Sequence, residues 1–128
     1  MSIIAKNQKK DRLTVVKSNA LVEAEYSLTS YESKILLICI GKIDSMSELD
    51  SSEYHTVTAS ELTELTGVAS NNAYRCLKVS AESLFERRIR IEDAESNTTI
   101  DFRWVSKVEY MHSVGAIRLR FSQDIIPF

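Results

Sequence analysis

The sequence of 128 residues has very little of the two residues that interrupt regular structure, with only one proline and three glycines. This scarcity excludes collagen-like and low-complexity chains, and three glycines are too few for a glycine-rich loop that cradles a nucleotide phosphate. The two cysteines, Cys39 and Cys76, lack CxxC spacing and cannot build a disulfide framework, so we expect both to be reduced. With 44% hydrophobic and 27% charged residues, a chain of this length can bury a core of its own.

Long hydrophobic runs are also missing. The longest one, Ile35 to Ile40, is far shorter than the ~20 residues of a membrane-spanning helix. No leader-peptide cleavage pattern follows an apolar run near Met1. We therefore expect a soluble, cytoplasmic protein with no membrane partner.

The sequence offers few groups for catalysis. His55 and His112 are the only histidines, and neither sits in an HxH or HExxH motif that would supply metal ligands. Neither a GxSxG turn nor a GxxxxGK[ST] loop occurs. We therefore expect no catalytic residue, no metal site and no cofactor, and we do not expect an enzyme.

The net charge of −2 is unevenly distributed along the chain. Residues 1–17 carry a net charge of +4, residues 18–69 carry −7, and residues 70–128 carry +1. Domains that rely on nucleic-acid affinity alone are usually basic, because neutralising phosphates supplies most of that binding energy. Any DNA contact by this chain must therefore be local or assisted by another domain.

Several segments in the first half of the sequence carry residue patterns that predict helices. Residues 1–13 show no periodicity and predict a mobile basic arm, followed by one domain over residues 14–128. A short helix is predicted over residues 20–25, and capping-box spacing at Thr29 and Glu32 predicts a core helix over residues 30–43. The polar stretch 44–53 is typical of an exposed loop.

A second group of signals predicts a helix-turn-helix followed by strands. Thr58 and Glu61 repeat the capping-box spacing before a short helix that Gly67 would end, and Ser70 is predicted to cap a longer helix. From Arg87 the hydrophobic period changes from 3.6 to 2, which predicts an antiparallel hairpin and then a second turn near residues 112–115. The predicted fold class is α+β, a winged helix-turn-helix with helices packed on a small antiparallel β-sheet.

The longer helix would present polar side chains suited to reading bases in the major groove, since Asn pairs with adenine and Arg with guanine. The predicted DNA-binding residues on this helix are Asn71, Asn72, Arg75 and Lys78. Glu82 and Glu86 lie on the same helix and weaken its field. The alternative is that these side chains are merely solvated and that the domain serves for dimerisation or protein docking.

A set of basic residues alternates with apolar ones in the predicted strands and would line one face of a sheet, where it could contact a phosphate backbone. The predicted DNA-binding residues of this set are Arg88, Arg90, Arg103 and Lys107, with Arg118 and Arg120 on the same face. The equally weighted alternative is that they pair across strands with Glu92, Asp101 and Glu109.

Two segments resemble a known family. The opening V-V-K-S-N-A-L-V-E-A of residues 15–24, followed by L-T-S-Y-E-S-K-I-L-L of residues 28–37, resembles the start of the iteron-binding replication initiators (Rep proteins) of bacterial plasmids. The ending L-R-F-S-Q-D-I-I-P-F of residues 119–128 is similar to that family's link from the wing strand into the next helix.

The resemblance implies that the complete protein has two winged-helix domains and that this chain is the first, truncated before the second. It also implies double-stranded DNA partners, namely origin repeats bound by the monomer and an operator bound by a repressing homodimer, with host replication proteins as further candidates. For the dimer interface we predict the strand around Ile100, Phe102, Trp104 and Val105, whose edge could extend a partner's sheet. The alternative is a stand-alone winged-helix transcription regulator.

Overall fold

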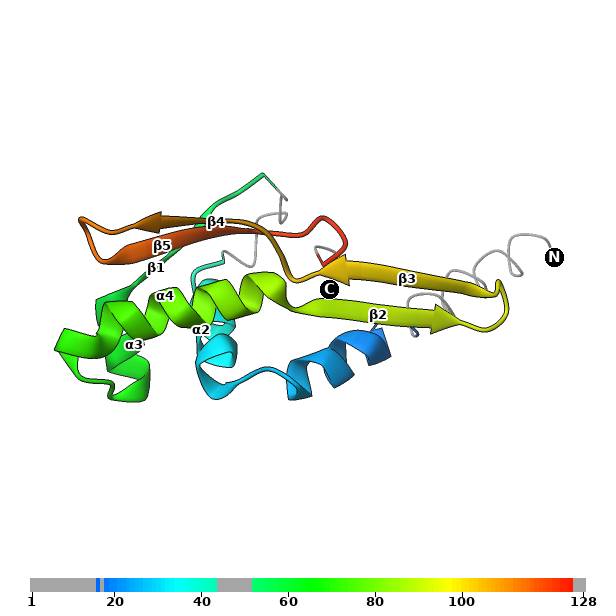
Figure 1. Cartoon of the computed structure of the whole chain (residues 1–128), viewed down its shortest axis with the longest axis horizontal. Helices are drawn as coiled ribbons and strands as arrows, with labels where there is room; N and C mark the ends of the chain where they lie inside the picture. The colour runs from blue at the N-terminus through cyan, green and yellow to red at the C-terminus, as the bar shows by residue number, and fades with distance from the viewer. Residues whose placement is uncertain (1–15, 17, 44–51, 126–128) are drawn as a thin grey trace.

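The computed structural model describes residues 16, 18–43 and 52–125, which form helices packed against antiparallel strands (Figure 1). The predicted arm at residues 1–13 lies outside these residues, as does most of the predicted loop at 44–53. Residues 18–26 are helical, close to the predicted range of 20–25. The elements that follow are α2 (Ser30–Gly41), β1 (His55–Thr58), α3 (Ala59–Thr66), α4 (Ser70–Glu86), β2 (Arg88–Asp93), β3 (Thr98–Arg103), β4 (Val105–Met111) and β5 (Ala116–Phe121).

Both predicted capping boxes are present. At the start of α2 the Thr29 hydroxyl accepts a hydrogen bond from the Glu32 backbone N–H, and the Glu32 carboxylate accepts one from the Thr29 backbone N–H. Thr58 and Glu61 do the same at the start of α3. Each box satisfies two backbone donors that a helix N-terminus otherwise leaves unpaired, so these helices begin where the sequence predicts.

Helix α4 is continuous over 17 residues, and its apolar face is buried as predicted. Ala73, Leu77, Ala81 and Leu84 are each almost completely shielded from solvent. The prediction that Ser70 caps this helix is wrong, because Ala69 occupies the N-cap position and supplies no side-chain hydrogen bond. Ser70 is instead the first residue of the helix.

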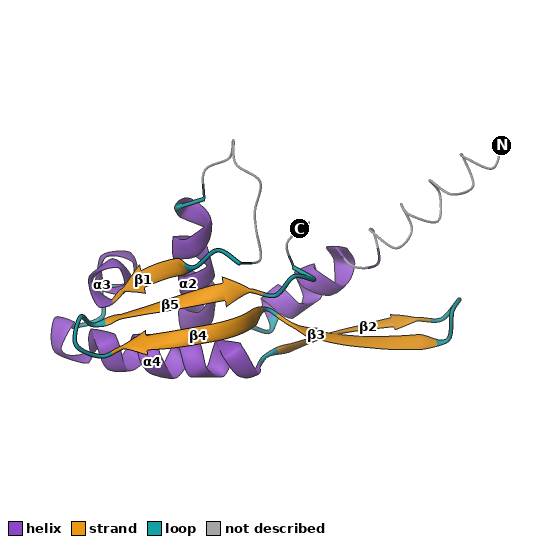
Figure 2. Ribbon diagram, turned by 90° about the horizontal axis from the view of Figure 1, so that it is seen from above, coloured by secondary structure: helices purple, strands orange, loops and turns teal. Residues whose placement is uncertain are grey.

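The strands form two separate sheets (Figure 2). One has the order β1-β5-β4, with β5 antiparallel to both neighbours, and α2 and α4 cover one of its faces (Figure 1). The other is the hairpin β2-β3, in which Ile89 lies opposite Phe102 and Ile91 opposite Ile100. Both predicted turns are confirmed, but the first hairpin is a separate arm and does not join the larger sheet.

The hairpin β2-β3 extends away from the main body and lies beside the helix of residues 18–26 (Figures 1 and 2). Its apolar residues Ile89, Ile91 and Phe102 belong to the same buried cluster as Leu21 of that helix. This cluster continues under the larger sheet to Leu77, among other residues of α4 and β5. Among the described residues, no helix is long and apolar enough to cross a membrane.

Candidate nucleic-acid interface

Helices α3 and α4 form the predicted helix-turn-helix. Leu62 of α3 is fully buried in the cluster that contains Leu77 of α4. Gly67 ends α3 with φ +76°, a left-handed conformation that glycine adopts without the steric cost a β-carbon would add. The tight turn at Gly67 therefore fixes how α4 is presented to solvent.

The four predicted base-reading residues occupy the first half of α4, on its solvent side. Asn71 and Arg75 are exposed, and Asn72 and Lys78 are half-buried along the margins of the exposed face. Arg75 donates a hydrogen bond of 3.3 Å to Asn72 Oδ1, and Lys78 Nζ lies 3.9 Å from Glu82. The structure therefore brings the four residues together on one exposed surface, while their contact with bases stays a prediction.

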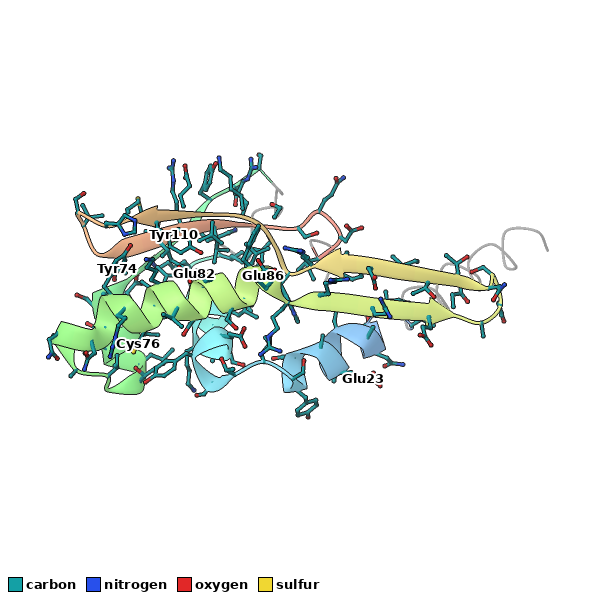
Figure 3. The ribbon with its side chains drawn as sticks, viewed as in Figure 1. Glu23, Tyr74, Cys76, Glu82, Glu86 and Tyr110 are labelled. Atoms are coloured by element: carbon teal, nitrogen blue, oxygen red, sulfur yellow. The ribbon has the colours of Figure 1, made fainter. Side chains whose placement is uncertain are left out.

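The second half of the same face has a different character. Val79, Glu82 and Glu86 follow Arg75 along the exposed arc of α4, and Figure 3 shows the two glutamates toward the end of the helix nearest the hairpin. Carboxylates repel a phosphate backbone, so Glu82 and Glu86 make the second half of this face less suited to DNA than the first half, which carries Arg75 and Lys78. The first residues of a recognition helix are the ones that usually contact base edges.

The β4-β5 turn lies next to the first half of α4. The hydroxyl of Tyr74 on α4 lies 2.8 Å from Nδ1 of His112, and the ring of His112 stacks on Tyr110 of β4 with a centroid distance of 6.4 Å. Figure 3 labels Tyr74 and Tyr110, which lie close to each other. Burial raises the pKa of both tyrosines, so the Tyr74 hydroxyl keeps its proton at neutral pH. This link fixes the turn of residues 112–115 beside α4, a contact that no local sequence signal indicates.

The predicted row of basic residues on one sheet face is wrong, because the residues belong to two different sheets. Arg88, Arg90 and Arg103 lie on the hairpin, whereas Lys107 lies on β4. Within the hairpin, Arg90 makes two hydrogen bonds of 2.8 and 2.9 Å to Asp101 on the opposite strand. This pairing holds the pKa of Asp101 below its ordinary value. The alternative of cross-strand pairing is therefore confirmed for Arg90.

The other two hairpin arginines, Arg103 and Arg88, differ in their contacts and in their exposure to solvent. Arg103 donates to the Phe85 carbonyl at 3.1 Å and lies over the Phe85 ring, which ties it to the end of α4. Arg88 is exposed and lies opposite Arg103 in the strand register. The Arg103 guanidinium lies 4.0 Å from the Glu86 carboxylate, so its charge is partly balanced within the chain, whereas Arg88 faces solvent.

A buried ionic cluster fixes the base of the hairpin. Arg87, the residue between α4 and β2, donates from two guanidinium nitrogens to the Glu32 carboxylate at 3.0 Å each. The Ser83 hydroxyl donates to the same carboxylate at 2.8 Å. Burial alone would raise the pKa of Glu32, but the hydrogen bonds from Arg87, Thr29 and Ser83 together lower it. The carboxylate is therefore ionised while fully buried, and it clamps α2, α4 and the hairpin together.

The predicted dimer-interface residues divide into one exposed residue and three core residues. Ile100 on β3 is 37% exposed, whereas Phe102, Trp104 and Val105 are buried within the chain itself. Side chains that are already buried have little surface left to lose to a partner. An interface at this strand would therefore use Ile100 and the backbone edge, and the interface itself stays a prediction.

The described residues include no group of three or more His, Cys, Asp or Glu side chains placed to hold a metal ion. Cys39 is buried, which raises the pKa of its thiol to about 12. A thiol with such a pKa remains protonated at neutral pH and makes a poor nucleophile or metal ligand. Cys39 therefore acts as a small hydrophobic residue of the core.

Comparison with known proteins identifies the family. Residues 14–128 match the family described as initiator replication protein, WH1. A replication initiation protein of Escherichia coli is 26% identical over 118 residues, which are 91% of this chain and 37% of that protein. The chain thus spans little more than a third of the length of this relative.

Two solved structures share the fold. The WH1 domain of MSBI1.176, a replication protein isolated from a multiple sclerosis patient, superposes with a TM-score of 0.77 and 29% identity over 89% of each chain. The Pi initiator protein, solved in complex with iteron DNA, superposes with a TM-score of 0.70 and 19% identity over 82% of this chain and 45% of its own. The winged-helix class predicted from the sequence is confirmed by these matches, and the chain belongs to the family of replication initiator WH1 domains.

Proposed function

We propose that this chain is the N-terminal domain of a plasmid replication initiator, where it mediates dimerisation and provides accessory contacts to DNA. In this proposal the monomer binds origin repeats and the dimer represses the initiator's own gene. The observation that carries the proposal is the exposed first half of α4, where Asn71 and Arg75 stand beside the β4-β5 turn in a chain of the initiator WH1 family. The near-neutral charge suits a domain that assists a second DNA-binding domain.

The DNA contact is tested with substitutions on α4. We expect Arg75→Gln to weaken binding to a duplex carrying the origin repeats by about 1–3 kcal/mol, the value of one bidentate base contact. Glu86→Gln, at the far end of the same exposed face, is the matched control and should not weaken binding. Fluorescence anisotropy titrations at two salt concentrations measure both. Equal affinity of wild type and Arg75→Gln would refute base reading by this residue.

The dimer is proposed to form through the free edge of β3. Among the described residues, β3 pairs only with β2, so its other edge is able to add a strand from a second copy. A dimer interface that competes with the DNA-binding monomer would make the ratio of repressor to initiator depend on protein concentration.

Sedimentation of the chain at micromolar to high micromolar concentration tests the dimer. We expect a concentration-dependent dimer that Ile100→Asp weakens, because the substitution places a charge on the proposed interface. Val114→Asp, at the tip of the β4-β5 turn, replaces another exposed apolar residue and should leave the dimer intact. A strict monomer at high micromolar concentration would refute the dimer proposal.

The alternative of a stand-alone transcription regulator is supported by the complete helix-turn-helix within this chain. It requires sequence-specific binding without any further domain. A titration against the repeat duplex and a random duplex separates the two proposals. An accessory domain should bind both weakly and with steep salt dependence, and its preference for the repeat should not exceed the roughly 1–3 kcal/mol of a single base contact. A stand-alone regulator should prefer the repeat by a factor of about 10³ or more.

A further inference from the structure

The face of the β1-β5-β4 sheet that points away from α2 and α4 carries a cluster of cations around one aromatic ring. Val57, Ile117 and Leu119 point into the core from this sheet and are fully buried. Because side chains alternate along a strand, Arg118 and Arg120 of β5 point to the opposite face. Figure 3 shows nitrogen-bearing side chains on that side of the sheet.

Three cations converge on the ring of Tyr54, the residue just before β1. Arg118 lies 4.3 Å, Arg120 5.3 Å and Lys107 5.5 Å from the ring centroid. Lys107 Nζ also donates to the Tyr54 hydroxyl at 2.9 Å. A ring face attracts cations, so Tyr54 favours the gathering of these side chains. We define these four residues as the Tyr54 cluster.

Among the described residues, the Tyr54 cluster makes ion pairs with one carboxylate. Glu109 of β4 pairs with Arg118 and lies 4.0 Å from Lys107. Within the described part of the chain, the Arg120 guanidinium makes no hydrogen bond or ion pair, and its Nε is buried without a partner. Lys107 and Arg118 side chains remain 46% and 42% exposed. The cluster therefore presents accessible donors and a net charge that one or two phosphates would balance.

We infer that the Tyr54 cluster is a second nucleic-acid contact, which binds the phosphate backbone of a DNA segment other than the one facing α4. Helix α4 packs against the inner face of the sheet, so one duplex on the exposed side of α4 does not also cover the outer face (Figure 1). Arginine and lysine donors around an aromatic ring are the groups that bind a nucleic-acid backbone without reading its sequence. This inference rests on the proposed DNA-binding function and adds a separate surface to it.

The test measures how the binding constant K depends on salt concentration. Each phosphate that the protein neutralises adds a fixed increment to the slope of log K against log salt. We expect Lys107→Gln or Arg120→Gln each to reduce the slope of log K against log salt by about 0.9 for a random duplex and about 0.7 for a single strand. The double variant should reduce it by about twice as much. Lys34→Gln on α2 removes one charge from the other side of the sheet and should leave the slope unchanged. A reduction seen only with the duplex or only with the single strand identifies which form the cluster binds.

A variant of opposite sign makes the test stronger. Glu109→Gln removes the carboxylate that competes for Arg118 and Lys107, so it should tighten binding and steepen the slope. The thermal unfolding midpoint of each variant should stay close to that of wild type, because none of these side chains belongs to the hydrophobic core, and this measurement shows whether the fold persists.

Two results would overturn the inference. One is a salt slope that stays at the wild-type value in the double variant for both forms of DNA. The other is equal competition by poly-glutamate of the same total charge, which would assign the cluster to acidic protein segments. Arg75→Gln in the same titrations distinguishes the two proposals. If Arg75→Gln loses affinity while the Lys107 and Arg120 variants bind like wild type, the Tyr54 cluster is not a DNA contact, and the proposed role of α4 stands.

Discussion

Replacing Arg87 by methionine should destabilise the domain strongly, although Arg87 lies at the edge of the core. The Glu32 side chain has no exposed surface, and its carboxylate would lose both guanidinium hydrogen bonds while remaining buried. Removing one partner of a buried ion pair costs about 3–5 kcal/mol. We expect about 3 kcal/mol, the lower end of this range, because 35% of the Arg87 side chain is exposed and water is able to reach part of the gap.

Urea unfolding followed by the fluorescence of Trp104 measures this loss. Trp104 is the single tryptophan of the chain and is buried, so its emission reports the core directly. The midpoint should fall while the slope m stays constant, which is the signature of a change in stability alone. Arg90→Met removes a similar two-bond arginine-carboxylate pair from the exposed face of the hairpin and should leave the midpoint almost unchanged.

A double-mutant cycle isolates the ion pair from other effects of the substitution. Glu32→Gln with Arg87→Met should be less destabilised than the sum of the single variants by about 1 kcal/mol or more, because each single change leaves the other group without its partner. A loss below about 1 kcal/mol for Arg87→Met, or additive single variants, would refute the clamp formed by Glu32, Ser83 and Arg87.

The same clamp predicts how stability depends on pH. The pKa of Glu32 is lowered in the folded chain, so its contribution is complete above pH 4.5 and is lost as the pH falls through the folded pKa. Arg87→Met removes the main hydrogen-bond donor and should raise that pKa, which moves acid unfolding to higher pH. Acid titrations of wild type and variant, followed by Trp104 emission, measure the shift. Identical acid midpoints would contradict the assignment.

Three further predictions concern single side chains. Burial lowers the pKa of His55, so stability should decline as the pH falls below 6.5, and His55→Phe should flatten that decline in urea midpoints measured across the range. Gly67→Ala should cost about 1–2 kcal/mol in urea unfolding because of its left-handed backbone, whereas Gly41→Ala, where φ is not positive, should cost nothing. Thr58→Ala should cost about 1 kcal/mol by removing the cap of α3, and an unchanged midpoint would contradict it.

Local signals in the sequence predicted local structure well. The capping boxes at Thr29 and Thr58 depend on bonds between residues three apart, so spacing alone indicates them. The apolar face of α4 and the alternation in β2 and β3 likewise depend on neighbours along one element. The stabilising role of Glu32 was not predictable in this way, because its partner Arg87 lies 55 residues further along the chain.

The division into two sheets was also beyond the sequence pattern. Alternation shows which residues of a strand share a face, but it does not show which strands pair. β1 is only four residues long, and it pairs with β5 about sixty residues later. Because the sequence does not reveal that pairing, its alternation pattern predicts that the arginines of the hairpin and those of β5 form one row. The same lack hides the cluster around Tyr54. The Tyr74–His112 contact escaped prediction for the same reason.

The distribution of ion pairs bears on the DNA contacts that we propose for a domain with a net charge of −2. Arg87, Arg90 and Arg118 are each paired with a carboxylate, so they contribute more to the structure than to the external field. Among the described residues, two groups of the remaining cations lie close together, at the start of α4 and around Tyr54, while the exposed Arg88 lies apart on the hairpin. Binding at each place should be weak alone, because affinity for a polyanion grows with the number of phosphates neutralised. A stable complex then requires both surfaces, a second copy or a further domain, which is the behaviour expected of an accessory module.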